Sequence, residues 1–167
     1  MINDISALTQ DVCSLKIAAA SKASVVLMHM KGCPYSMDNN GDYIDVVEEV
    51  NEYLGSRIMA CQGAGIEKHR ICIDPGIGFG KDMRQNLTIL RRLEEYKSIG
   101  RPILVGTSRK STIGNILQVP VHERTYGTAA SIAIAIAKGT NIVRVHDVGE
   151  MAQVCKMSDA IIREGAQ

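Results

Sequence analysis

Side chains capable of chemistry follow directly after short apolar runs in this sequence. Ile71 to Ile73 is one such run, and it ends at Asp74, followed by Pro75 and a glycine-rich stretch. An apolar run bounded by Gly and Pro predicts a buried strand. In parallel sheets covered by helices, ligands bind at the carboxyl ends of the strands. The sequence therefore places Asp74 at a ligand-binding edge, with glycines that allow the backbone to approach closely.

The same pattern recurs at the ends of four other apolar runs. The side chains found there are Asn3, Met28 with His29, Lys110, and the pair Arg144 and His146. Because strand side chains alternate between faces, we expect Arg144 and His146 to project in the same direction. Two potential cations on one face suit a phosphate or a pyrophosphate, and Arg offers paired, planar donors.

Each of these residues also has an ordinary structural explanation. Arg144 could pair with a neighbouring carboxylate, and His146 could be a core histidine. Asp74 could accept hydrogen bonds from the amidine-like edge of a heterocycle such as a pterin, or it could cap a loop or helix. Lys110 could reach a ring carbonyl or a phosphate, or be a solvated loop lysine. Asn3 could read a heterocycle edge with its donor and acceptor atoms, or stand in a turn.

Composition excludes several classes of function. The chain has 167 residues and a net charge of +1, which favours neither nucleic acid nor an anionic membrane as a partner. We find no apolar run near the length of a membrane span and no signal peptide, so we expect a cytoplasmic protein. The five cysteines include no C-x-x-C pair, which suits reduced thiols. Residues 1–167 show no linker or compositional break, and we expect a single domain.

Apolar periodicity predicts an alternation of strands and helices. We expect strands over 1–5, 25–30, 71–73, 102–107 and 141–145, and helices over 9–21, 43–62, 86–97, 113–117, 123–138 and 147–163. Residues 31–41 are rich in Gly, Pro and Asn and predict an exposed loop. Strands that alternate with helices indicate right-handed parallel crossovers, hence an α/β fold.

Helix caps and inward faces follow from the same patterns. We expect Thr9 and Asn86 to cap their helices, and Asp147 with Glu150 to form a capping box. The first helix would direct Val12, Leu15 and Ala19 inward, and the second Ile44, Val47, Val50, Leu54 and Ile58. For the helix over 86–97 two inward sets are possible, Leu87, Leu90 and Leu93 or Ile89, Leu93 and Tyr96.

Five motifs in this order resemble the dihydropteroate synthase family of folate synthesis. They are I-N-D-I-S at 2–6, V-V-L-M-H-M-K-G at 25–32, D-P-G-I-G-F-G-K at 74–81, G-T-S-R-K-S at 106–111 and R-V-H-D-V at 144–148. The resemblance implies a TIM (β/α)8 barrel fold. It also implies the condensation of 6-hydroxymethyl-7,8-dihydropterin diphosphate with para-aminobenzoate, which gives 7,8-dihydropteroate and pyrophosphate.

The resemblance also implies roles for residues that match the family's motifs. Asn3, Asp74 and Lys110 match pterin-binding positions, and Met28 matches an apolar wall of the pterin pocket. Arg144 and His146 match the diphosphate-binding positions, Arg144 also lying against the pterin. The matches to positions near para-aminobenzoate are Phe79 and Ser111. On this basis Lys110, Arg144 and His146 are the expected catalytic residues.

The chain is shorter than the fold that the resemblance implies. A TIM barrel takes about 250 residues and eight strands, whereas this sequence matches the fourth to eighth strands, a partial barrel of about five. The family's Mg²⁺ ligand belongs to the part that is not matched, so no metal ligand is expected here. Open strand edges at 1–5 and 141–145 would favour a homo-oligomer or pairing with the remaining half.

Two alternatives to a synthase remain open. One is a non-catalytic pterin- or phosphate-binding half-barrel that needs a partner chain. The other, less well supported, is a pterin-dependent methyltransferase, against which the S-R-K and R-V-H motifs argue.

Overall fold

The computed structural model describes residues 1–32 and 42–162, in which parallel strands alternate with helices. The strands are β1 (Ile2–Asp4), β2 (Val25–Met28), β3 (Ile71–Asp74), β4 (Leu104–Val105) and β5 (Ile142–Val143), and the helices are α1 (Ser14–Ala20), α2 (Val46–Gly63), α3 (Met83–Arg91), α4 (Ser111–Leu117), α5 (Thr125–Ala137) and α6 (Val148–Ile162). The expected alternation is therefore confirmed. Most of the loop expected over 31–41 falls outside the described residues.

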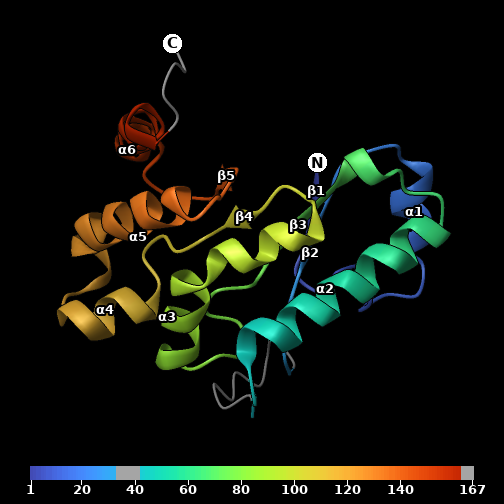
Figure 1. Cartoon of the computed structure of the whole chain (residues 1–167), viewed down its shortest axis with the longest axis horizontal. Helices are drawn as coiled ribbons and strands as arrows, with labels where there is room; N and C mark the ends of the chain where they lie inside the picture. The colour runs from blue at the N-terminus through green and yellow to red at the C-terminus, as the bar shows by residue number, and fades with distance from the viewer. Residues whose placement is uncertain (33–41, 163–167) are drawn as a thin grey trace.

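All strand pairs are parallel, and the strands follow one another in chain order. β1, β2 and β3 form one sheet, β4 and β5 a second, and a parallel bridge between Ile73 and Ile103 joins the two. Within the described residues β1 pairs only with β2, and β5 only with β4, so each end of the sheet has an open edge. This arrangement, with helices along the strands (Figure 1), is a partial α/β barrel.

The two faces of the sheet bury different sets of side chains. Val25, Leu27, Ile71 and Ile73 belong to the main core, which they share with apolar residues of α2 and of the segment Leu93–Ile99. The other face carries a small cluster of Val26, Cys72, Leu104 and Ile142. Strand side chains alternate between faces, so a residue two positions after a member of this small cluster lies on the same, inner face of the sheet. Met28, Asp74 and Arg144 are such residues.

The first helix is shorter than expected. It begins at Ser14, with Cys13 rather than Thr9 as its N-terminal cap residue. The Asp4 carboxylate accepts the backbone N–H groups of Ser6 and Leu8, which holds the preceding residues in a turn. Val12 is 98% exposed, so its expected inward position is wrong, whereas Leu15 and Ala19 pack against the core.

Helices α2 and α3 also differ from expectation at their N-termini. Asp45 caps α2 by accepting the N–H groups of Val47 and Glu48, and Ile44 lies outside the helix and fully exposed. The other four expected α2 residues are buried. Asp82, not Asn86, caps α3, in a capping box with Gln85. In both helices the capping group is a carboxylate that lies next to the free N–H groups of the first turn.

Past Arg91 the chain continues as a 3₁₀ helix over Leu93–Ile99, so the single helix expected over 86–97 is divided. Of the two inward sets considered, Ile89, Leu93 and Tyr96 is correct, since all three are fully buried. At the start of α6 the Asp147 carboxylate pairs with the Arg109 guanidinium. In the described part of the chain, no helix is both long and apolar enough to cross a membrane.

Candidate functional site

Asp74 is a buried carboxylate at the carboxyl end of β3. Its side chain is 5% exposed, and Oδ1 accepts the backbone N–H of Gly76 at 2.7 Å. Burial raises the pKa of Asp74 above its usual range, while the Gly76 hydrogen bond and the nearby Lys110, Lys81 and Arg144 oppose the rise. The carboxylate is therefore held by a loop and has Lys110, Lys81 and Arg144 near it.

Lys110 comes from the loop after β4 and extends to the loop after β3. Its ammonium donates to the Ile77 carbonyl and lies 4.7 Å from the centre of the Phe79 ring. Burial lowers the pKa of Lys110 to about 8, although Asp74 acts in the opposite direction. The sequence pattern could not decide between a solvated lysine and a site lysine, and the structure places Lys110 with Asp74 and Phe79.

Arg144 and His146 follow β5, and both are exposed. They line a cavity of about 450 Å³ together with Lys110 and Ser108. The expectation that these cations gather at one end of the sheet is met by this cavity. An opening lined by Arg144, His146 and Lys110 suits an anion larger than a single carboxylate.

Ser108 is a residue that the sequence analysis did not single out. Its hydroxyl oxygen lies 2.9 Å from Nδ1 of His146 and accepts the backbone N–H of the same histidine at 3.1 Å. Ser108 is 5% exposed, so this contact is shielded from water. It fixes the imidazole relative to the loop after β4. The only sequence signal was its place within G-T-S-R-K-S, beside Lys110.

Lys81 and His29 form a second buried polar centre, to which the sequence analysis gave no role. The Lys81 ammonium donates to the carbonyls of Gly76 and Phe79, each at 3.0 Å, and lies 3.0 Å from Nδ1 of His29. Burial lowers the pKa of Lys81 to about 7 and that of His29 to about 3. The sequence does not predict the burial of a lysine at the end of a glycine-rich loop, because most lysines are exposed to solvent.

Asn86, which was expected to be a helix cap, instead braces the glycine loop. Its side-chain oxygen accepts the Gly78 N–H at 2.7 Å, and its amide donates to the carbonyls of Lys81 and Asp82. The side chain is 2% exposed. The prediction failed because Asp82, four residues earlier, already caps α3.

Arg109 links the ends of β4 and β5. Its guanidinium pairs with both carboxylate oxygens of Asp147, and its own carbonyl accepts from Arg124. Arg109 therefore holds the Lys110 loop next to the segment with Arg144 and His146.

The remaining expected site residues lie close to this centre in the sheet. Met28 is paired in register with Asp74, and Asn3 with Val26, two residues before Met28. Met28 is buried and Asn3 exposed. Ser111 is exposed and begins α4, next to Lys110. The sheet register therefore brings Asn3, Met28 and Asp74 to one end of the sheet, as their positions after apolar runs predict.

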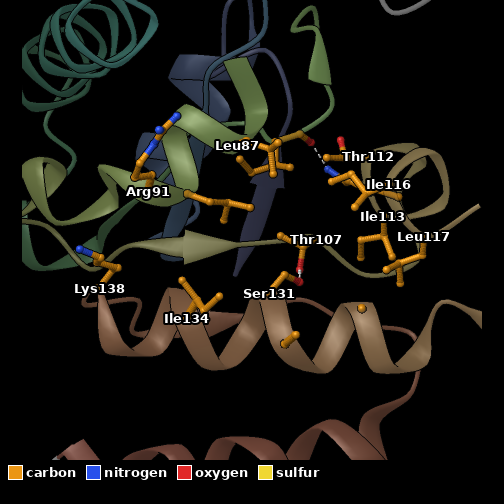
Figure 2. A pocket seen from close by; sticks show the side chains of 15 residues that line it. Leu87, Arg91, Thr107, Thr112, Ile113, Ile116, Leu117, Ser131, Ile134 and Lys138 are labelled. Carbon is orange, nitrogen blue, oxygen red and sulfur yellow. Dashed lines mark hydrogen bonds between the residues drawn. The ribbon is translucent and has the colours of Figure 1, made fainter. Parts of the chain in front are cut away.

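A separate cavity of about 530 Å³ lies between α3, α4 and α5. Figure 2 shows its apolar walls, with Arg91 and Lys138 at one end and a hydrogen bond of 2.8 Å between Thr107 and Ser131. Lys110 lines both this apolar cavity and the polar cavity of Arg144 and His146, so the Lys110 side chain lies between the two cavities. The apolar lining does not fit the anion chemistry of the site around Arg144 and His146.

Over residues 1–32 and 42–162, no group of three or more His, Cys, Asp or Glu side chains is placed to hold a metal ion. The described part of the site is thus a set of cations around one buried carboxylate, which is a poor donor set for Mg²⁺.

Comparisons with known proteins agree with this geometry. The family model described as "Pterin binding enzyme" matches residues 1–146. A dihydropteroate synthase of Synechocystis sp. is 47% identical over 164 residues, which are 98% of this chain and 57% of that protein. The chain thus spans somewhat over half the length of this relative.

Solved structures of the same enzyme match the fold closely. The Yersinia pestis dihydropteroate synthase in a sulfonamide drug complex has a TM-score of 0.93 and 39% identity, covering 96% of this chain and 58% of the other. The Xanthomonas albilineans dihydropteroate synthase in complex with 7,8-dihydropteroate has a TM-score of 0.88 and 37% identity, with shares of 96% and 58%. This chain belongs to the pterin-binding enzyme family.

Proposed function

We propose that this chain carries the pterin and diphosphate sites of a dihydropteroate synthase. The reaction joins 6-hydroxymethyl-7,8-dihydropterin diphosphate to para-aminobenzoate and releases pyrophosphate and 7,8-dihydropteroate. The observation that carries the proposal is the buried Asp74 carboxylate with Lys110 and Arg144 beside it, at the end of the sheet where Arg144 and His146 open to solvent. The dihydropterin diphosphate has a donor-rich ring, which suits the buried Asp74. It also has a negatively charged diphosphate, which suits the exposed Arg144 and His146.

The buried end of the site suits the pterin ring. The Asp74 carboxylate would accept ring N–H groups, and Lys110 would donate to a ring acceptor when it leaves the Ile77 carbonyl. Met28 would form an apolar wall, and Asn3 would offer a further donor and acceptor. Because Asp74 is shielded from water, its hydrogen bonds to a ligand would be strong.

The exposed end suits the diphosphate and its departure. Arg144 and His146 would bind the phosphate oxygens, and they would stabilise the charge that develops as the C–O bond to the leaving group breaks. The positive charge on the carbon that remains would be delocalised into the pterin ring. The amine of para-aminobenzoate could then attack this carbon without a strong base. Phe79 and Ser111 would lie near para-aminobenzoate. Catalysis would then consist mainly of orientation and charge stabilisation.

The family resemblance implies Mg²⁺, but the described residues do not supply a ligand set for it. We therefore assign no metal ligand to this chain and derive no step through a metal.

A second candidate function is a non-catalytic pterin- or phosphate-binding half-barrel that acts only with a partner chain. It is favoured by the open edges of β1 and β5 and by the exposure of Arg144 and His146. Edge strands pair readily with other chains, so a homo-oligomer or a complex with the complementary half of the barrel would close the site.

The test is calorimetric titration of the purified chain with dihydropterin diphosphate, together with its solution mass. We expect saturable binding that Asp74→Ala abolishes and that Asp11→Ala, at an exposed carboxylate, leaves unchanged. Failure of the folded wild-type chain to bind would contradict the proposed pterin site.

Turnover distinguishes the two candidate functions. The chain would be mixed with a separately purified amino-terminal half of a homologous synthase and supplied with para-aminobenzoate. Formation of 7,8-dihydropteroate supports the synthase, whereas binding without turnover under every pairing supports the half-barrel.

A further inference from the structure

The Lys81 ammonium is the most completely surrounded cation of the site region. It is 2% exposed and donates to three carbonyls, those of Gly76, Phe79 and, at 3.4 Å, His29. Two of these carbonyls belong to the glycine loop and the third to the residue after β2. The ammonium therefore connects these two segments.

The glycine loop also packs directly against the backbone after β2. A Cβ on Gly76 would lie 1.9 Å from the His29 carbonyl oxygen, and one on Gly80 would lie 2.0 Å from that of Lys31. The carbonyl oxygens of His29, Gly76 and Phe79 all lie within 3.4 Å of the Lys81 ammonium, and carbonyl oxygens that converge on one point repel one another unless they share a donor. Lys81 supplies that donor, since its ammonium carries three hydrogens and accepts none.

The loop that Lys81 holds in turn contacts Lys110. The Ile77 carbonyl accepts from Lys110, and the Phe79 ring lies under its ammonium. Both contacts come from residues inside the segment 76–80. The position of this segment therefore decides where Lys110 stands relative to Asp74.

We propose that Lys81 is a positioning residue, whose buried ammonium fixes the segment 76–80 against the end of β2 and thereby places Lys110 in the site. Lys81 itself would not touch the substrate, because its three hydrogens are shared among backbone carbonyls and Nδ1 of His29. The consequence for ligand binding rests on the proposed function, whereas the effect on the loop and on Lys110 does not.

The burial of this cation supports a role beyond packing. Desolvation lowers the pKa of Lys81, so the folded chain holds the ammonium at an energetic cost, while Asp74 partly offsets it and Lys110 adds to it. An apolar side chain of similar length would avoid that cost. Retaining the ammonium is useful if its three donors organise the loop.

The test compares wild type with Lys81→Met, and with Lys16→Met at an exposed helix position as the matched control. The first readout is the NMR shift of the Lys110 ε-methylene, which the ring current of Phe79 displaces. Phe79 is the only Phe of the chain, so the effect is readily assigned. We expect Lys81→Met to lose this displacement and to speed amide exchange at residues 78–80 by about tenfold or more.

The second readout is a double-mutant cycle on the binding of dihydropterin diphosphate. Lys81→Met should weaken binding about tenfold in the wild-type background and have little further effect when Lys110→Met is present. Additive effects of the two substitutions would overturn the proposal, because Lys81 would then act independently of Lys110.

Three further outcomes decide the interpretation. If wild type binds no pterin, the proposed function fails, while the methylene shift and the exchange rates still decide the role of Lys81. If Lys81→Met does not fold, Lys81→Gln replaces it, since its amide still donates to two carbonyls, and a smaller change of the same sign is expected. An unchanged Lys110 shift and unchanged loop exchange in a folded Lys81 variant would overturn the proposal.

Discussion

Ser108 holds His146 through two contacts, at 2.9 Å from its hydroxyl oxygen to Nδ1 and at 3.1 Å from the backbone N–H to the same oxygen. A neutral His146 that accepts the hydroxyl hydrogen at Nδ1 carries its own hydrogen on Nε2. That form directs a donor away from Ser108 and toward the open cavity. With that direction of the hydrogen bond, Nε2 is the imidazole nitrogen that would donate to an anion.

Replacing Ser108 with Ala should therefore mix the two tautomers of His146. We expect nitrogen NMR to show mainly the Nε2–H form in wild type and a mixture in Ser108→Ala. Pyrophosphate binding should weaken about five- to tenfold, the value of one ordinary hydrogen bond. Ser98→Ala, at an exposed serine, is the control. An unchanged tautomer ratio would show that Ser108 does not orient the ring.

Asp74→Asn should stabilise the fold while it removes pterin binding. Because burial raises the pKa of Asp74, the protonated carboxyl favours folding at low pH, and this contribution is lost as the pH rises through the folded pKa. At neutral pH the variant avoids the cost of a buried charge, and Asn can still accept the Gly76 N–H. We expect a gain of about 1–2 kcal/mol in urea unfolding. A destabilised variant would mean that the surrounding cations outweigh the burial.

The stability of wild type relative to Lys81→Met should rise with pH. Burial lowers the pKa of Lys81 from 10.5 to about 7, so between these values the unfolded chain binds more protons than the folded chain. The free energy of unfolding of wild type should then gain about 4 kcal/mol over this interval relative to the variant. Lys110 titrates in both proteins, and its coupling to Lys81 contributes less to the difference than the desolvation of Lys81 does. Parallel urea curves at pH 7 and pH 10 would contradict this.

Gly76→Ala should destabilise the chain far more than Gly100→Ala. Both glycines have left-handed backbones, with φ of 71° and 67°, so the conformational penalty of about 1 kcal/mol is common to both. Only at Gly76 would the new Cβ meet a backbone oxygen, that of His29; around Gly100 the space is open. We expect a further loss of about 2 kcal/mol or more at Gly76, measured by urea unfolding. Equal losses would show that the loop can move away from β2.

The inner and outer faces of the sheet were predictable from the sequence because strand side chains alternate. The apolar runs that end at Met28 and Asp74 predicted two strands. They also predicted the end of the sheet at which these two residues lie. Helix starts were less predictable. Thr9 and Asn86 are good cap residues by type, but the nearby Asp4 and Asp82 already held the local N–H groups. Cap propensity is a local preference, and a competing carboxylate a few residues away overrides it.

By itself, the sequence determined the order of the elements, the parallel sheet and the residue types at each strand end, because periodicity and glycine placement act locally along the chain. The tertiary structure alone decided which polar side chains work together. Lys81 reaches His29 across 52 residues, and Ser108 reaches His146 across 38. Such contacts depend on how far two loops approach in space, and no local pattern records that distance.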